Sequence, residues 1–294
     1  MPEPEYREVK AEEERRLLRD FGYWDLVAFG ALVGAGLGFL HGLGEEPSLR
    51  AANVFAGMGA GALCAFIAGW ARAQLRARER FFTRWAAKRG WTYTPAGQPF
   101  EDTPFLLSGD RRRASDFFSG LPIAPGAVLY QHKRIVGSGK SEQVSNYLVL
   151  HFGLDRVLIP LLQIWPHRRV ADLGGKLFAH QEMTGEQVEL ESIELMQQFR
   201  ISGLAGGGAE IRKLLTPSAI VKLLDFRRAF RGGRAYFETD GKVVAFLVEM
   251  KLSPSNPRQI DELLALWQPI ADWLTEEARV ASVPADGSGG RELP

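Results

Sequence analysis

The sequence has a single cysteine, Cys64, which lies inside an apolar segment. One thiol cannot form an intramolecular disulfide, and a metal site built from several cysteines is excluded. The scarcity of cysteine fits a soluble part in a reducing, cytosolic environment. Net charge is also nearly absent, at +1 over 294 residues, because local blocks of opposite sign cancel. The total charge therefore excludes no class of partner.

The sequence also lacks the features of a cleavable signal peptide, since its first residues are acidic and its first apolar stretch begins late and runs long. Charged residues are rare in two stretches, Trp24–Leu43 and Ala51–Ala71, which only Gly44–Arg50 separates. Each has about the 20 residues that an α-helix needs to cross a hydrocarbon core. The sequence therefore predicts a transmembrane helical hairpin over residues 23–73. A buried hairpin of a soluble protein is the alternative, although core helices rarely stay apolar on every face.

Small residues recur at every fourth position in both apolar stretches. On a helix this spacing aligns them in one ridge, where two backbones approach closely. The two ridges are expected to pack against each other, or to assemble several copies into an oligomer or a small pore. The predicted helix-packing residues are Gly30, Gly34, Gly38, Gly42, Gly57, Gly61, Ala65 and Gly69.

Basic residues gather before the first apolar stretch and after the second, whereas Gly44–Arg50 carries one arginine and two glutamates. This distribution predicts a multi-pass protein of the inner (plasma) membrane with both termini in the cytoplasm. The second helix is expected to continue as a basic juxtamembrane helix over residues 74–90, lying on the anionic inner leaflet. Nucleic acid is the alternative partner, but a basic run beside a span is usually a topology signal, so none is expected. The predicted lipid-surface residues are Arg72, Arg76, Arg78, Arg80, Arg84, Lys88 and Arg89.

Three polar side chains flank the apolar stretches: Asp25 at the inner edge of the first, and His41 and Asn53 near the outer edge. Ionisable groups inside a membrane often form proton or ion relays. None of the three lies near the middle of a span, so interfacial placement is favoured over a relay.

From Trp91 the pattern changes to short apolar strands mixed with amphipathic helices. It predicts a cytoplasmic α+β domain over residues 91–280 with a mostly antiparallel sheet, between a charged N-terminal segment (1–22) and a disordered tail (281–294). Phe100–Gly120 is turn-rich. The expected strands are Trp91–Thr94, Ala127–Val136, Val144–Phe152, Arg156–Trp165, Leu177–Glu182, Ala235–Thr239 and Lys242–Glu249.

Local signals fix several boundaries inside this domain. Asp240 and Gly241 form the clearest hairpin turn, and Thr216 before Pro217 predicts a capped helix start. Helices are also expected over Ser192–Phe199 and after Asn256–Pro257. Pro160 is expected to break its strand or to place it at an edge. Charged residues at 155 and 156 argue against a third span over Tyr147–Trp165.

The segment Gly137–Ser141 (GSGKS) resembles the end of a phosphate-binding loop, with Gly139, Lys140 and Ser141 as candidate nucleotide-binding residues. The full motif requires a glycine where Arg134 stands, and a helix where Val144–Phe152 predicts a strand. A polar hairpin loop is therefore the favoured interpretation, and no cofactor is expected.

No other chemistry-bearing pattern emerges. The glycines of Gly203–Gly208 lack the spacing of a dinucleotide-binding turn. No two histidines have metal-ligand spacing on one helical turn, although His132 and His151 could face each other across a hairpin. Carboxylates such as Glu189, Glu191 and Glu194 are too common to nominate as an acid–base pair. We nominate no catalytic or metal-binding residue.

Five short stretches resemble a bacterial family of membrane proteins of unknown function, of the high-GC Gram-positive type. The resemblance implies two N-terminal spans before one cytoplasmic α+β domain, and it implies no activity or catalytic residue. The stretches are Trp85–Pro95, Gly109–Gly120, Glu191–Ile201, Leu214–Leu224 and Tyr236–Phe246. We expect a membrane-anchored binding or scaffolding module whose domain contacts a protein or a small ligand. The alternatives are a membrane oligomer or small pore, and a nucleotide-binding enzyme that uses Lys140.

Overall fold

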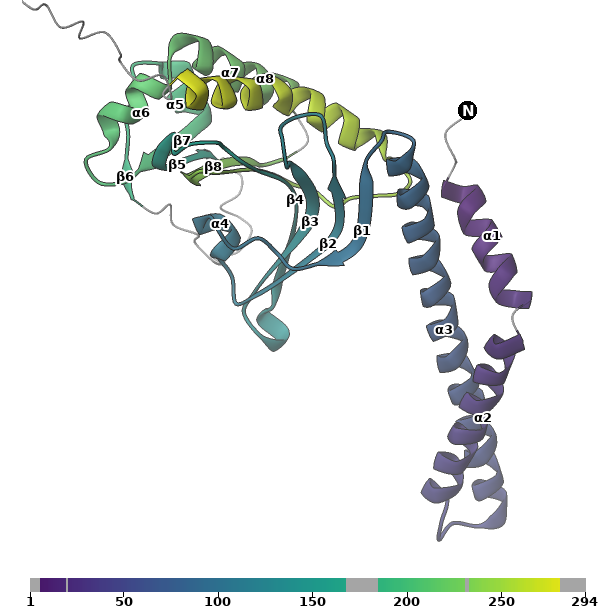
Figure 1. Ribbon diagram of the computed structural model, residues 1–294. Coiled ribbons are helices and arrows are strands. Elements are labelled where there is room, and N and C mark those ends of the chain that lie inside the picture. Colours follow the sequence, from purple (N-terminus) through teal and green to yellow (C-terminus); the bar gives the residue numbers. More distant parts are fainter. Residues whose placement is uncertain (1–5, 20, 168–184, 231–232, 281–294) are drawn as a thin grey trace, which may run out of the picture. The chain divides into compact units, whose positions relative to one another are not determined.

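The computed structural model describes residues 6–19, 21–167, 185–230 and 233–280 (Figure 1). The chain divides into two compact units, Met1–Lys88 and Arg89–Pro294. The expected strand Leu177–Glu182 and the tail 281–294 lie outside the described residues.

The first unit is helical, with α1 (Tyr6–Arg19), α2 (Phe21–His41) and α3 (Pro47–Ala87). Pro47 lies in the first turn of α3, where its missing N–H costs no intrahelical hydrogen bond. Gly44 turns the chain between α2 and α3 with a φ of +96°, in the left-handed region that favours glycine. The 41 residues of α3 form one helix, so the basic run continues the second apolar stretch as predicted.

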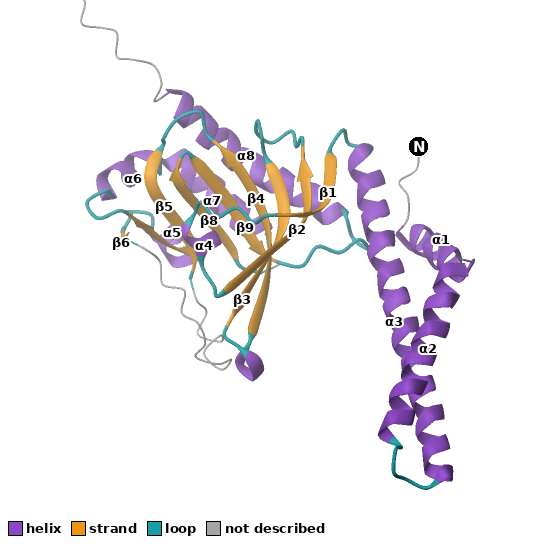
Figure 2. Ribbon diagram, turned by 60° about the horizontal axis from the view of Figure 1, so that its bottom comes forward, coloured by secondary structure: helices purple, strands orange, loops and turns teal. Residues whose placement is uncertain are grey.

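The second unit contains a nine-stranded sheet in its described part, in the order β1-β2-β3-β4-β9-β8-β5-β7-β6 (Figure 2). Every neighbouring pair is antiparallel. The strands are β1 (Thr92–Gly97), β2 (Arg111–Ser119), β3 (Val128–Val136), β4 (Gln143–Gly153), β5 (Ile159–Pro166), β6 (Glu186–Gln187), β7 (Phe199–Gly203), β8 (Ala235–Gly241) and β9 (Val243–Glu249). The helices are α4 (Pro104–Leu107), α5 (Ile193–Gln198), α6 (Gly208–Leu214), α7 (Pro217–Ala229) and α8 (Arg258–Val280), and the 3₁₀ turn is η1 (Gly139–Ser141).

Helices pack on both faces of this sheet. On β9, Phe246 stacks on Trp267 of α8 with ring centroids 5.8 Å apart. Its neighbour Leu247 belongs to the buried cluster around Phe105 of α4. Because successive strand residues point to opposite faces, α8 and α4 lie on opposite faces. The α+β class predicted from the sequence is confirmed.

Most local signals agree with the structure. The hairpin predicted at Asp240–Gly241 joins β8 to β9, although Asp240 pairs with Val243, so Gly241 and Lys242 form the turn itself. The Thr216 side chain accepts a hydrogen bond from Ala219 N at the start of α7. Pro160 differs from expectation, since β5 pairs with both β8 and β7 and is an interior strand. A register shift between Ile159 and Leu161 accommodates the missing N–H of this proline.

Candidate functional site

The predicted glycine ridges lie at the contact between α2 and α3. A Cβ atom added at Gly34 would overlap the carbonyl oxygen of Gly57, and one added at Gly57 would overlap that of Gly34. A Cβ at Gly30 would lie 2.7 Å from the carbonyl oxygen of Gly61 and 2.9 Å from Cβ of Ala65. Backbone therefore meets backbone here, which only side chains this small permit.

The remaining predicted ridge positions also have neighbours along the hairpin. Added Cβ atoms would meet Asn53 at Gly38, Arg50 at Gly42 and the Tyr23 ring at Gly69. Gly36 and Gly59, by contrast, have open space around them. The hairpin thus contains two classes of glycine that differ only in which side of the helix they occupy.

The outer surface of the hairpin is apolar and exposed. In the described part of the chain, α2 and α3 are the two helices long and apolar enough to cross a membrane. Only 17% and 11% of their most apolar 18-residue stretches are buried, unlike the core helix of a soluble protein. Large exposed side chains include Phe29, Leu32, Leu37, Leu40, Phe55, Leu63 and Ile67.

The three polar residues beside these stretches do not form a relay. Asp25 and His41 lie near opposite ends of α2. Because a helix rises about 1.5 Å per residue, the residues between them keep the two side chains far apart along the helix axis. Asn53 donates a hydrogen bond to Glu45 in the connector at 3.0 Å. The interfacial interpretation is consistent with these positions.

The basic part of α3 meets glutamate side chains of α1. Glu13 of α1 is buried and pairs with Arg80, while Gln74 donates a hydrogen bond to Glu14 at 2.9 Å. Tyr6 packs edge-on against Phe81 with ring centroids 5.5 Å apart. Part of the predicted lipid surface is therefore occupied by α1.

The other predicted lipid-surface residues differ in their surroundings. Arg72 and Arg76 are exposed, whereas Arg84 lies 3.9 Å from Glu12. In the second unit, Arg89 binds both carboxylate oxygens of Asp261 at 3.0 and 2.7 Å. The remaining positions are Arg78, which lies over the Phe82 ring, and Lys88, which is exposed.

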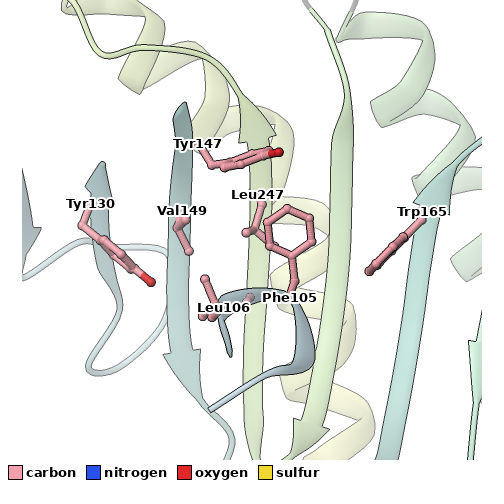
Figure 3. Close-up of a cluster of buried hydrophobic side chains, with 8 residues drawn as sticks. Phe105, Leu106, Tyr130, Tyr147, Val149, Trp165 and Leu247 are labelled. Carbon is pink, nitrogen blue, oxygen red and sulfur yellow. The ribbon is translucent and has the colours of Figure 1, made fainter. Parts of the chain in front are cut away.

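On the sheet, α4 fills the centre of an aromatic face (Figure 3). Phe105 packs edge-on against Tyr147 and Trp165 with ring centroids 4.9 and 5.8 Å apart. Beside it, Leu106 is fully buried. The cluster contains Phe105, Leu106, Tyr130, Tyr147, Val149, Trp165, Ala245 and Leu247.

A buried carboxylate on β8 holds α4 in this position. Glu238 is fully buried and accepts hydrogen bonds from the backbone N–H of Phe105 at 2.8 Å and from Trp165 Nε1 at 3.1 Å. Gln163 donates to the same carboxylate and accepts from the Ser202 hydroxyl at 3.1 Å. Burial raises the pKa of the Glu238 carboxyl to about 7, although these hydrogen bonds oppose the rise. The network positions the start of α4. Among the described residues it includes no nucleophile with a base beside it.

Sequence analysis did not single out Glu238. A detectable signal exists, because this carboxylate directly follows the apolar and aromatic residues Ala235–Phe237 inside the predicted strand Ala235–Thr239. A charged residue inside a predicted buried strand requires a partner. Nothing in the sequence says that the partner is the four-residue helix α4.

The two strand histidines do not face each other. On β3 and β4, His132 is the register partner of Tyr147, and His151 is the partner of Val128. His151 lies 2.7 Å from Asp102, whereas His132 is fully buried with neither ring nitrogen hydrogen-bonded within the described residues. Burial lowers the pKa of His132 to about 4, with help from two nearby arginines. Among described residues no group of three or more His, Cys, Asp or Glu side chains is placed to hold a metal ion.

The Gly137–Ser141 segment forms the connection between β3 and β4. Its Gly137 N–H donates to Asp110 at 2.7 Å, and the Ser141 hydroxyl donates to the carbonyl of Ser138 at 3.0 Å. The single 3₁₀ turn at Gly139 leads directly into β4. The side chain of Lys140 lies outside the described structure. The Gly137 amide is thus occupied by the Asp110 carboxylate and the Ser141 hydroxyl by a carbonyl of the loop, which favours the hairpin-loop interpretation.

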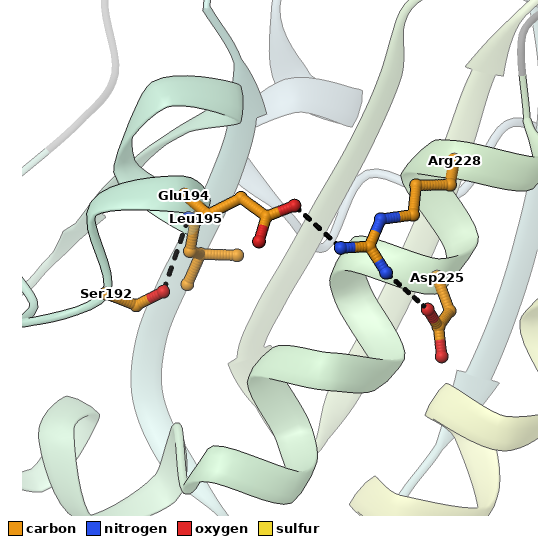
Figure 4. Close-up of polar contacts among 5 residues, drawn as sticks. All are labelled: Ser192, Glu194, Leu195, Asp225 and Arg228. Carbon is orange, nitrogen blue, oxygen red and sulfur yellow. Dashed lines mark hydrogen bonds and ion pairs between the residues drawn. The ribbon is translucent and has the colours of Figure 1, made fainter.

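Of the three candidate carboxylates, Glu194 joins two helices (Figure 4). Its carboxylate accepts a 2.8 Å hydrogen bond from the guanidinium of Arg228 on α7, and the same guanidinium lies 3.2 Å from the Asp225 carboxylate. Ser192 caps the same helix by accepting from Leu195 N at 3.3 Å. These exposed contacts link α5 to α7 and assemble no acid–base pair.

Comparison of the sequence with protein-family models and with curated proteins finds no match. The crystal structure of the mycobacterial trehalose monomycolate transport factor A, TtfA, is similar with a TM-score of 0.42 and 12% identity. The similarity covers 67% of this chain and 93% of that chain. It transfers no activity, partner or residue role, and the resemblance to a bacterial membrane family stays a prediction.

Proposed function

We propose that this protein is a membrane-anchored binding or scaffolding module: a helical hairpin holds an α+β domain at the inner membrane. One observation carries the proposal. The hairpin packs through its small residues while its large apolar side chains remain exposed, which in water would leave an extended apolar surface uncovered. A bilayer covers such a surface.

The proposal includes the orientation inferred from charge, with both termini in the cytoplasm. The resemblance of five short stretches to two-span bacterial membrane proteins of the high-GC Gram-positive type supports the same arrangement. The binding role is inferred from an anchor joined to a folded domain in which we identify no catalytic constellation among the described residues. A protein or a small ligand is the proposed partner of that domain.

Neither alternative gains a specific observation. In the described hairpin the glycine ridges of α2 and α3 already meet each other, so assembly of several copies would need another surface. In the loop at Gly137, the Gly137 amide donates to Asp110 and the Ser141 hydroxyl donates to Ser138, so neither group is left to bind a phosphate.

Alkaline extraction of membranes tests the anchor. The full chain is expected to stay in the membrane pellet at high pH, and a variant lacking residues 23–73 is expected to be soluble. Release of the full chain by alkali, or equal pelleting of both proteins, would contradict the proposal. Circular dichroism of the deletion variant controls for misfolding.

A further inference from the structure

Two pairs of basic residues lie directly opposite each other on β2 and β3. Arg112 is the register partner of Arg134, and Arg113 is the partner of Lys133. Opposed side chains of an antiparallel pair share one face, and like charges there are destabilising. Since successive residues point to opposite faces, the two pairs lie on different faces of the sheet. Each pair therefore requires compensation.

The first pair is compensated by the chain itself. Arg112 Nε lies 3.0 Å from Glu101 Oε1, and its guanidinium also donates to the carbonyl of Leu107. The Arg134 guanidinium lies over the Phe105 ring, 5.7 Å from the centroid. An acidic side chain, a carbonyl and an aromatic ring thus accommodate the two positive charges on this face.

The second pair has no such compensation. Arg113 is exposed and Lys133 half-buried, and neither pairs with an acidic side chain among the described residues. The acidic residue of β2, Asp116, is buried and accepts hydrogen bonds from Tyr93 at 2.7 Å and Ser115 at 3.0 Å. On β4, the neighbouring strand on the other side of β3, the register partner of Lys133 is the neutral Asn146.

The segment that carries a third cation, Lys251, is tied to the same strand as Lys133. Gln131 lies two residues before Lys133 on β3 and therefore on the same face. Its side chain binds the backbone on both sides of Lys251, donating to Met250 O at 3.1 Å and accepting from Leu252 N at 2.5 Å. Lys251 itself is exposed. A buried glutamine thus ties the backbone on both sides of an exposed lysine to β3, the strand that carries Lys133.

We propose that Arg113, Lys133 and Lys251 bind the phosphate groups of anionic phospholipid headgroups. This inference rests on the proposed function, because an anchor in the bilayer gives the domain a high effective concentration of headgroups. Arginine supplies a planar fork that matches phosphate oxygens, and the lysines supply compact positive charges. Each such residue strengthens binding to an anionic leaflet about fivefold.

The test uses the full chain in nanodiscs of phosphatidylcholine mixed with phosphatidylglycerol that carries a photoreactive headgroup. Mass spectrometry then locates crosslinked peptides. We expect crosslinks on β2, on β3 and near Lys251. The double variant Arg113→Gln, Lys133→Gln is expected to lower their yield at least about fivefold.

A matched control removes the same charge elsewhere on the domain. Arg156 and Lys242 are exposed. Arg156 follows the C-terminal end of β4 and Lys242 precedes the N-terminal end of β9, and these two strand ends pair with each other. Their double variant, Arg156→Gln, Lys242→Gln, is expected to keep the wild-type crosslink yield. Hydrogen exchange across β8 and β9 checks that both double variants are folded.

Equal crosslink yields in the wild type and the Arg113–Lys133 variant would overturn the inference, and so would an equal loss of yield in the control variant. A third result would also overturn it, namely loss of crosslinks when inorganic phosphate or a single-stranded oligonucleotide is added at constant ionic strength. The last result would assign the site to free phosphate or to nucleic acid. Failure of the full chain to enter nanodiscs would instead refute the proposed anchor, so the two failures are distinguishable.

Discussion

At the scale of single residues, the two classes of glycine in the hairpin differ in whether an added methyl group would fit. Gly34 has the carbonyl of Gly57 where its Cβ would be, whereas Gly36 has open space. The sequence spacing predicted which glycines share a ridge. It did not predict which residue on the partner helix each one meets, because that depends on the length and geometry of the connector.

Gly34→Ala is expected to destabilise the α2–α3 contact by about 1–3 kcal/mol, since the added methyl group forces two backbones apart. Gly36→Ala is the matched control and should cost nothing measurable. Denaturant titration of the full chain in bicelles, followed by circular dichroism, measures both. Equal midpoints for the two variants would show that the ridge contact does not stabilise the hairpin.

Glu238 should give the second unit a distinctive dependence on pH. Its pKa is about 7 in the folded chain and near 4.5 without burial, so the unfolded chain ionises first. The stability contributed by this group is fully present below pH 4.5. It is lost as the pH rises to about 7, by up to about 3 kcal/mol.

The Glu238→Gln variant should lack this dependence. We expect the ratio of hydrogen-exchange rates between wild type and variant, measured in β8 and β9 at matched pH, to rise from pH 5 to pH 8. A ratio independent of pH would mean that the carboxyl of Glu238 ionises normally.

At the scale of elements, α4 shows where sequence reasoning ends. Its four residues are too few for a periodic signal, and they lie in a segment expected to be turns. Strand β2 was missed for a related reason, because three successive arginines hide its alternation. The turn at Asp240–Gly241 was predictable because hairpin chemistry is local. The strand order was not, because contacts such as that between β5 and β8 join residues far apart in the chain.

The account of α4 predicts a sharp contrast between neighbours in the same short helix. Phe105→Ala should destabilise the second unit by about 3–5 kcal/mol, because it removes a buried ring from the aromatic cluster. Leu107→Ala is the control, since Leu107 is 50% exposed, and it should cost far less. Hydrogen exchange of β4 and β9 in the full chain reports both changes. Similar losses of stability in the two variants would contradict the account, because they would show that burial of Phe105 in the aromatic cluster adds no particular stability.

At the scale of the whole molecule, the account depends on whether a bilayer surrounds the hairpin. Hydropathy predicted both helices, and the structure adds that their ridges pack together while the apolar outer side chains stay uncovered. The single cysteine lies in this region: Cys64 is on α3, and it is exposed. In water an exposed thiol would react readily with a maleimide, whereas one inside a hydrocarbon core would be shielded.

Labelling of Cys64 in native membranes with a membrane-impermeant maleimide therefore tests the central claim most directly. We predict almost no labelling of the full chain in intact or permeabilised membranes, and complete labelling after denaturation in sodium dodecyl sulfate. A Ser138→Cys, Cys64→Ala variant, with its thiol in the loop between β3 and β4, serves as the labelled control. Rapid labelling of Cys64 in permeabilised membranes would contradict the account, because it would place the apolar face of the hairpin in water.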